Sequence, residues 1–472
     1  MLNERDKIKH LYSRAGFGLS VNDWQTKSDW KKSLDVLFKS PSNYHSLQTI
    51  SLAEVEATKA KMRTMRKEDV KDLKKFLKQN VSELNNLWLQ EMIDGEAQLQ
   101  EKMALFWHGH FACRSLNPYF DQQYLDIIRK NSLGNFSVLL NEISKTPAML
   151  QFLNNQQNKK DHPNENFARE LMELFTIGRG NYTEQDVKEA ARAFTGYGFD
   201  KTGEFKFRIQ QHDFGTKIFL GKSGSFTGDD ILQIILKKNE CAYFITKKIY
   251  RFFVNDNPDE TIVKQLAKHF YESNYDIKGL LKEIFSSDWF YDEMNIAAKI
   301  KSPIELLVGL SRTIPIDFEN EQSPLFIQRS LGQVLLNPPN VAGWPGGRNW
   351  IDSSSLLFRM RLPQVIYYDE ELDFSPKEDM PEQGMMRLKM TDEFIKRFVQ
   401  KKLAAKPDWM KALQYFSSSA NIMDDIVKML LAKPCAASAR KCIQNNRDTS
   451  SKESEIKSVM IEVMSLPDYQ LC

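Results

Sequence analysis

The chain has 472 residues, of which 42% are hydrophobic and 11% aromatic. This length and apolar content suffice for a large buried core and predict about two to four domains or subdomains. Charged residues make up 27% of the chain and the formal net charge is +3. That balance is ordinary for a globular protein and argues against a dedicated nucleic-acid binder.

The cysteine content and the N-terminal residues indicate the type of cellular compartment. An odd count without a CxxC pair argues against a disulfide framework and against a structural zinc ribbon. The first residues, MLNERDKIKH, include no apolar core of a secretory leader, and no window of about 18 residues is apolar enough for a transmembrane helix. We therefore expect a cytoplasmic protein as given, or an exported one if a leader has been removed. The cysteines are Cys113, Cys241, Cys435, Cys442 and Cys472.

Helical periodicity dominates the first 200 residues. Short helices joined by turns are expected over 1–50, a strongly charged helix or helical pair over 52–90, and further helices over 91–155. Two more follow at 164–178 and 184–195. The second begins with a capping signal, Thr183 with Asp186, and stops at Gly196.

The apolar period then changes. Residues 203–221 alternate polar and apolar side chains and predict a small β-hairpin or ribbon. Helices resume at 229, and the Pro/Gly/Trp-rich segment 337–350 predicts an irregular loop. We thus predict a mostly α, multi-helical globular fold. Its expected parts are a main helical domain over 1–365, an exposed connection over 366–390, and a C-terminal helical segment over 391–472 packed on the main domain.

The helix at 164–176 presents a charged face. At about 100° per residue, Glu165, Arg169 and Glu173 share one side, with Glu170 beside them, while apolar residues occupy the opposite side. One interpretation is a solvated face with i, i+4 ion pairs, and the pattern alone favours it. The other is a site wall, in which carboxylates bind a metal or move protons and the arginine holds them ionised.

Two histidine-containing segments offer further chemistry. His108-Gly-His110 could bring two imidazoles to one ion if a helix ends there, or the rings could pack among Phe106, Trp107 and Phe111 with backbone partners. His212 and Asp213 lie on the predicted ribbon, where adjacent side chains point to opposite faces, so each could reach a pocket separately as ligand or base.

Several common motifs are missing. The sequence contains no GxxxxGK[ST] phosphate loop, no HExxH and no GxSxG elbow. This argues against most nucleotide-dependent and hydrolase classes. The loop 337–350 has two open interpretations, a rigid loop whose tryptophans fill the core or a rim over a pocket.

Taken together and in this order, six segments resemble a bacterial family called domain of unknown function 1800, over about residues 8–435. The resemblance implies a mostly helical protein. It also implies a companion, since many members carry an export leader and occur beside proteins resembling alkaline phosphatases and sulfatases; this chain departs from that pattern at its N-terminus. The segments are 10–18, 102–111, 164–175, 182–196, 212–213 and 338–347.

Two hypotheses for function follow. The first is a metal-assisted enzyme, a hydrolase or an oxidoreductase, with a divalent transition metal held by His108, His110 and His212. Candidates for its catalytic groups are Glu165, Arg169, Glu170, Glu173 and Asp213, with the arginine orienting the carboxylates or binding an anionic substrate group. The second is a non-catalytic helical scaffold or a partner of the phosphatase- or sulfatase-like companion, in which the same polar cluster is a structural ion-pair network. Neither predicts a nucleic-acid partner, and the oligomeric state is left open.

Overall fold

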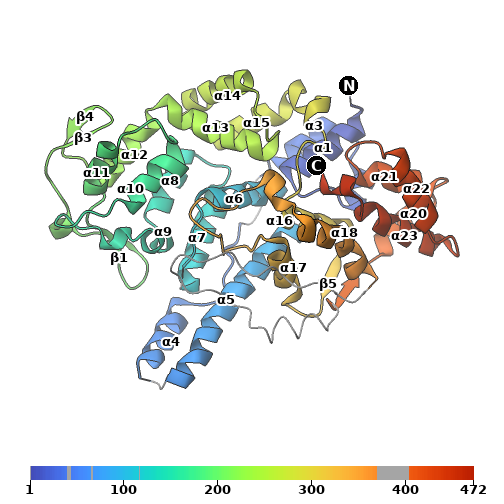
Figure 1. Cartoon of the computed structure of the whole chain (residues 1–472), viewed down its shortest axis with the longest axis horizontal. Coiled ribbons are helices and arrows are strands. Elements are labelled where there is room, and N and C mark those ends of the chain that lie inside the picture. The colour runs from blue at the N-terminus through green and yellow to red at the C-terminus, as the bar shows by residue number, and fades with distance from the viewer. Residues whose placement is uncertain (1, 40–43, 65–66, 116, 369–402) are drawn as a thin grey trace.

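The computed structural model describes residues 2–39, 44–64, 67–115, 117–368 and 403–472. Over these residues the fold is mostly α, as predicted, with three two-stranded antiparallel sheets (Figure 1). Most of the predicted connection 366–390 lies outside the described residues. In the described part of the chain, no helix is both long and apolar enough to cross a membrane.

The N-terminal third is a helical assembly with one projecting arm. The charged segment 52–90 forms the arm as two paired helices, and its small apolar cluster of Ile50, Val55 and Leu77 is separate from the main core (Figure 1). The helices are α1 (Glu4–Ala15), α2 (Val21–Thr26), α3 (Trp30–Leu37), α4 (Leu52–Thr64), α5 (Lys67–Asp94), α6 (Gln98–His110), α7 (Pro118–Asn131), α8 (Phe136–Ser144), α9 (Pro147–Phe152) and the 3-10 turn η1 (Asn155–Gln157).

The predicted helix at 164–178 has two parts. α10 (Asn166–Glu170) continues into η2 (Leu171–Thr176), a π-helical turn in which the Ile177 amide bonds to the Met172 carbonyl. α11 (Glu184–Ala193) follows, and its predicted cap is confirmed. The Thr183 hydroxyl accepts from the Asp186 amide at 3.1 Å, and the Asp186 carboxylate accepts from the Thr183 amide at 2.9 Å. Past the end of α11, Gly196 takes φ +84°, which favours glycine.

The predicted ribbon at 203–221 is two hairpins rather than one. β1 (Tyr197–Phe199) pairs with β2 (Phe205–Phe207), and β3 (Lys217–Phe219) pairs with β4 (Lys222–Gly224), while η3 (Ile209–Gln211) separates the hairpins. The second turn consists of Leu220 and Gly221, both at positive φ. Such a two-residue turn directs β3 to the strand that follows it, so β2 and β3 do not pair with each other.

The rest of the described chain is again helical. β5 (Ile316–Phe318) pairs with β6 (Ala405–Pro407), which ties the C-terminal part to the preceding helices. The elements are α12 (Gly228–Leu236), α13 (Asn239–Phe253), α14 (Glu260–Glu272), α15 (Ile277–Ser286), η4 (Asp288–Tyr291), η5 (Glu293–Asn295), α16 (Pro303–Thr313), α17 (Ser323–Leu331), η6 (Gly347–Trp350), α18 (Ser353–Tyr367), α20 (Met410–Phe416), α21 (Ile422–Leu430), α22 (Ala437–Asn446), α23 (Lys452–Met464) and η7 (Pro467–Gln470).

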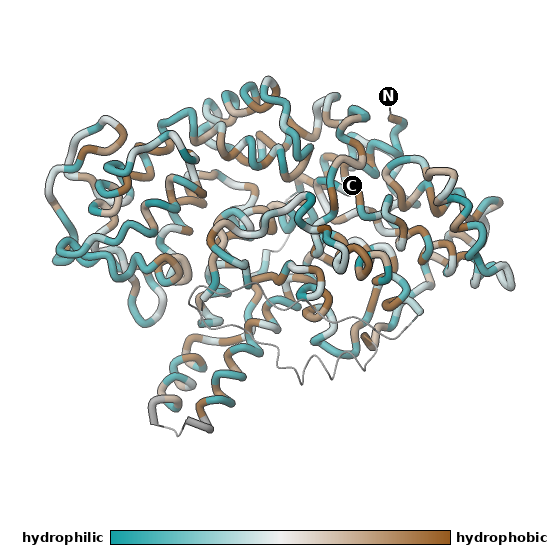
Figure 2. The backbone as a smooth tube through the Cα atoms, in the orientation of Figure 1, coloured by the Kyte–Doolittle hydropathy of each residue, from teal (hydrophilic) through white to brown (hydrophobic). Residues whose placement is uncertain are grey.

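One large apolar core runs through the chain. It joins Leu11 near the N-terminus, Trp107 and Phe167 in the middle, and Met460 near the C-terminus. Figure 2 shows why the helices assemble this way, since most carry apolar residues along one side and polar residues along the other. The C-terminal helices share this core, with α23 packed on α18 and α20 packed on α2.

Candidate functional site

The two segments singled out by sequence meet at the end of the π-helical turn. His110, the last residue of α6, is buried, and its Nε2 donates to the Phe175 carbonyl at 3.0 Å. The last carbonyls of a helix have no amide partner within that helix. His110 therefore binds the 164–176 helix through its backbone, and not through the predicted carboxylates.

Lys248 of α13 completes this junction. Its Nζ donates to the Leu174 carbonyl at 2.9 Å and to His110 Nδ1 at 3.1 Å. Because Nε2 of His110 faces a carbonyl and must bear the proton, Nδ1 is the acceptor of a neutral ring. Burial lowers the pKa of His110 well below its usual value, and the Lys248 ammonium lowers it further. Burial also lowers the pKa of Lys248 to about 8. The two side chains together cap the helix end.

His108 points into a different environment. It is fully buried, and its Nε2 accepts from the Leu336 amide at 3.0 Å, which places the proton of the neutral ring on Nδ1. The His108 ring lies 5.3 Å from the Trp88 ring and 5.4 Å from the Trp344 ring. Burial lowers the pKa of His108 to about 3. His108 is thus a neutral acceptor between tryptophans.

The irregular loop 337–350 covers this histidine. A Cβ at Gly343 would lie 2.2 Å from the Gly109 carbonyl oxygen, so glycine permits the close approach of the loop to α6. Gly343 also takes φ +76°. Trp344 then packs half-buried against His108, while Trp350 is buried in the core.

The charged face of the 164–176 helix makes surface ion pairs. Arg169 binds Glu165 at 3.1 Å, as its i, i+4 spacing predicts, and forms a two-pronged pair with Glu184 at 2.7 Å. Glu173 does not pair with Arg169; it binds Arg179 at 2.7 Å. The wider π-helical turn moves residue 173 away from the position expected for an α-helix.

Glu170 is the remaining carboxylate of that face. It is half-buried, and burial, followed by the neighbouring Glu173, raises its pKa.

His212 and Asp213 also face different partners. Nδ1 of His212 donates to the Thr195 carbonyl at 2.9 Å, and its buried ring lies between Phe207 and Phe214. Asp213 accepts from Arg192 Nε at 2.7 Å, and this arginine lowers the pKa of the carboxyl. Both residues follow η3 and do not lie on a strand.

Of the predicted site residues, His110 thus contacts the helix at 164–176, while His108, His212 and Asp213 each contact other parts of the chain. Within the described ranges, no group of three or more His, Cys, Asp or Glu side chains is placed to hold a metal ion. The transition metal at His108, His110 and His212 stays a prediction.

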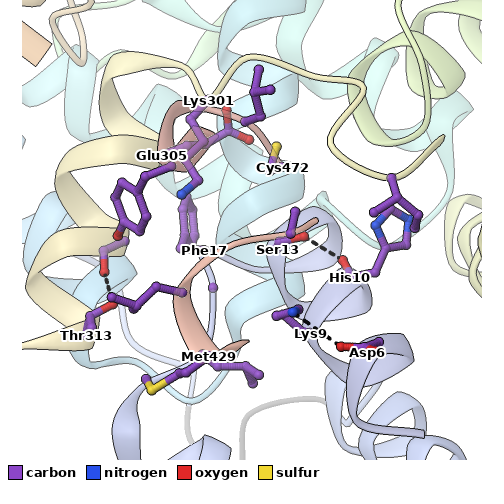
Figure 3. A pocket seen from close by; sticks show the side chains of 18 of the residues that line it. Asp6, Lys9, His10, Ser13, Phe17, Lys301, Glu305, Thr313, Met429 and Cys472 are labelled. Atoms are coloured by element: carbon purple, nitrogen blue, oxygen red, sulfur yellow. Dashed lines mark hydrogen bonds and ion pairs between the residues drawn. The ribbon is translucent and has the colours of Figure 1, made fainter. Parts of the chain in front are cut away.

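A pocket lies away from all of these residues. It encloses about 750 Å³, including its open mouth, between α1, α16, the end of α21 and the residues after η7 (Figure 3). Figure 1 shows these elements on the side of the molecule opposite α10 and α11. The polar residues of its wall are Asp6, Lys9, His10, Ser13, Lys301, Glu305 and Thr313.

Glu305 of the pocket wall belongs to a buried ion pair with Lys102, which is not itself a wall residue. Lys102 is 1% exposed; its Nζ binds the Glu305 carboxylate and donates to the Gly16 carbonyl at 2.8 Å. Burial alone would raise the pKa of Glu305, but Lys102 and the Ser302 amide lower it to about 2. Glu305 also completes the capping box that begins α16. This carboxylate is therefore ionised and already neutralised.

Three further cations surround that pair. Arg14 is 2% exposed and donates to the carbonyls of Val254 and Asn295, at 3.0 and 2.6 Å. Arg359, fully buried, donates to the carbonyl of Lys301.

Lys301 is the third of these cations. Its Nζ lies 3.6 Å from the centre of the Tyr469 ring and, among the described residues, has no hydrogen bond or ion pair. Burial lowers the pKa of Lys301 to about 8, against the opposing influence of Cys472 and Glu305.

No role was predicted for these pocket residues from their sequence pattern, although a weak signal was present. His10, Ser13, Phe17 and Gly18 fall inside the first segment of the family resemblance. Lys301 belongs to no motif and Glu305 to a helix-capping signal with Ser302, and only the folding of α16 onto α1 brings the two residues to the pocket.

A family model described as "Protein of unknown function (DUF1800)" matches residues 10–471. The match confirms the resemblance and extends it to the end of η7. No curated protein and no solved structure matches the chain.

Proposed function

The chain belongs to the DUF1800 family, and we propose that this protein binds a small anionic molecule in the pocket between α1, α16 and the C-terminal residues. The observation that carries the proposal is an excess of positive charge in and beside the pocket wall. Lys301 of the wall and the buried Lys102, Arg14 and Arg359 lie near two opposing groups, Glu305 and Cys472.

The neighbouring negative groups offset only part of this excess, since Cys472 and Glu305 face four cations. Asp6 pairs with Lys9 at 3.3 Å, and Asp256 pairs with Lys299, so both carboxylates already have a cation. Cations held away from water without a counter-ion are costly, and an anion bound nearby offsets that cost. A concave site with one sign of charge also concentrates ligands of the opposite sign.

Lys301 is the group best placed to contact the anion. Its Nζ has unused donors, whereas the ammonium of Lys102 and the guanidinium of Arg14 are occupied by protein acceptors. Apolar lining from Phe17, Leu19 and Met429 suits an organic body attached to the anionic group (Figure 3).

Thermal unfolding in the presence of probe anions tests the proposal. Inorganic phosphate, acetate and glyoxylate are titrated at constant ionic strength against a chloride control. A true ligand raises the melting temperature saturably, since a ligand at about 100 times its Kd adds about 2.7 kcal/mol to the unfolding free energy.

A matched pair of variants locates the site. Lys301→Met removes a pocket ammonium that has no hydrogen bond or ion pair within the described ranges, and we expect it to weaken binding by about tenfold or more, the loss of a charged hydrogen bond. Lys248→Met removes another lysine of lowered pKa outside the pocket and should leave binding unchanged. Equal shifts in chloride and in every probe anion, or equal affinity in Lys301→Met, would reject the proposal.

A structural role for the predicted charged cluster is the second candidate. The pairs Arg169–Glu184, Arg179–Glu173 and Arg192–Asp213 support it, because each places a predicted catalytic group or its partner in a saturated ion pair. This supports the scaffold hypothesis for that end of the molecule; a phosphatase- or sulfatase-like partner for it stays a proposal.

A further inference from the structure

Lys301 differs from the other lysine of the pocket wall, Lys9, and from Lys102, which pairs with the wall residue Glu305. The ammonium of Lys9 is engaged by Asp6 and by the Lys428 carbonyl, and that of Lys102 by Glu305 and the Gly16 carbonyl. The Lys301 amine, by contrast, lies over the face of Tyr469 and makes no hydrogen bond or ion pair among the described residues. It is half-buried and lines the cavity (Figure 3).

The surroundings of Lys301 increase the neutral fraction of its amine, although a pKa of about 8 leaves the ammonium the main form at neutral pH. Its carbonyl accepts from the Arg359 guanidinium. Burial lowers the pKa of its amine to about 8; Cys472 and Glu305 oppose this shift, while Arg359 and Lys102 act in the same direction as burial. A desolvated amine beside other cations is the usual way in which a protein activates lysine as a nucleophile. An amine with its lone pair free also needs room for an electrophile, which the cavity supplies.

We propose that Lys301 is a nucleophile that forms an imine with the carbonyl group of a small anionic aldehyde or ketone, such as a 2-oxo acid, held in this pocket. The inference rests on the proposed function, because the positive wall must first draw the anionic group into the cavity. It adds that the ligand has a carbonyl carbon within reach of Nζ.

The step is a condensation that balances without a further reactant. The Nζ lone pair attacks the carbonyl carbon and forms a C–N bond, giving a carbinolamine. The C–O bond then breaks, the oxygen leaves as water with the two hydrogens of the amine, and a C=N bond remains. The cationic surroundings stabilise the negative charge that develops on oxygen during the attack.

Reductive trapping tests this step on the full-length protein. The probe is glyoxylate, added with sodium borohydride, which reduces an imine to a stable secondary amine. A thiol adduct on the nearby Cys472 has no C=N bond and is not trapped in this way. Peptide mass mapping then reports the modified lysine. We expect trapping at Lys301 to exceed that at the average surface lysine by about tenfold or more, as the larger neutral fraction of a lysine with lowered pKa predicts.

Variants and a second aldehyde make the outcome specific. Lys301→Arg keeps the positive charge and should abolish trapping at this position, while Lys248→Arg, a lysine of similarly lowered pKa outside the pocket, should leave it intact. Propanal, which lacks the anionic group, should label Lys301 several-fold less than glyoxylate does. The melting temperature of Lys301→Arg reports whether that variant is folded.

Each result has one meaning. Saturable binding of glyoxylate in the thermal assay without trapping at Lys301 overturns the imine and leaves the anion site standing. Trapping spread evenly over surface lysines, or unchanged labelling of the pocket peptide in Lys301→Arg, also overturns it. Absence of trapping, together with absence of saturable binding by phosphate, acetate and glyoxylate, overturns the proposed function itself.

Discussion

His110 Nε2 donates to the Phe175 carbonyl, 3.0 Å away, and thereby joins the end of α6 to the end of the π-helical turn η2. Lys248 binds the other nitrogen of the same ring and the preceding carbonyl of Leu174. Three elements distant in sequence are held by one imidazole and one ammonium.

The first prediction concerns this junction. We expect His110→Phe to lower the unfolding free energy by about 1–3 kcal/mol, because the Phe175 carbonyl and the Lys248 ammonium each lose a buried partner. In the His110→Phe, Lys248→Met double variant the loss should be smaller than the sum of the single losses, since the two side chains bind each other. Urea unfolding measures all three variants. His162→Phe, at an exposed histidine, is the control, and strict additivity would contradict the coupling.

We predict that burial of His108 makes the stability of the fold sensitive to acid. Its pKa is about 3 in the folded protein against 6.5 as the ordinary value, so the unfolded chain binds more protons between these limits. Stability is therefore complete above about pH 6.5 and falls as the pH decreases toward 3, with a slope of up to about 1.4 kcal/mol per pH unit from this one group. His108→Gln keeps an acceptor for the Leu336 amide without titrating, and its stability should vary less with pH than that of the wild type. Parallel wild-type and variant curves would remove His108 from the explanation.

We predict that removing one partner of the buried Lys102–Glu305 pair strongly lowers the free energy of unfolding. Glu305→Gln leaves a buried ammonium without its anion, and we expect a loss of about 3–5 kcal/mol in unfolding free energy. Replacing both residues, as in Lys102→Met with Glu305→Leu, should cost less than Glu305→Gln alone. Chemical unfolding of the three proteins gives the comparison, and a Glu305→Gln variant as stable as the wild type would contradict it.

The same carboxylate predicts a second acid transition. Because the pKa of Glu305 is lowered to about 2, its contribution is present above about pH 4.5 and is lost as the pH falls from there toward 2. Glu305→Gln should lack this part of the pH dependence.

Metal content tests the sequence-based enzyme hypothesis. Each of the three histidines has its own backbone partner: the Leu336 amide for His108, the Phe175 carbonyl for His110 and the Thr195 carbonyl for His212. From this geometry we predict that the three rings do not share a metal ion. Elemental analysis of untagged protein should therefore give the same values for the wild type and for each His→Ala variant. A stoichiometric transition metal that disappears in one of these variants would restore the metal site.

Substitution of Arg169 distinguishes a surface network of ion pairs from a catalytic site on the 164–176 helix. Since Arg169 and its partners Glu165 and Glu184 are substantially exposed, we expect Arg169→Met to change the unfolding free energy by less than about 1 kcal/mol, and by less still in high salt. It should also leave anion binding in the pocket unaffected. A loss of binding equal to that in Lys301→Met would show that the two regions are coupled.

The sequence by itself determined the local structure of this protein. Apolar periodicity predicted the helices, the Thr183–Asp186 signal predicted the start of α11, and the Pro/Gly/Trp composition predicted the irregular loop. Each depends on residues a few positions apart, within which side-chain geometry and backbone preferences act directly. The family resemblance was likewise readable from short segments.

The tertiary structure alone decided where the polar groups act. The spacing of His108 and His110 was compatible with metal binding and with hydrogen bonds to the backbone. The structure shows the second, because the Leu336 amide contacts the His108 ring and the Phe175 carbonyl contacts the His110 ring. Lys301 carries no local signal, and the capping signal of Glu305 says nothing of the pocket. Their burial, their lowered pKa values and their neighbours Lys102 and Arg359 arise from contacts between distant parts of the chain. Electrostatic environment is a property of the packed interior, and periodicity within a single helix does not encode it.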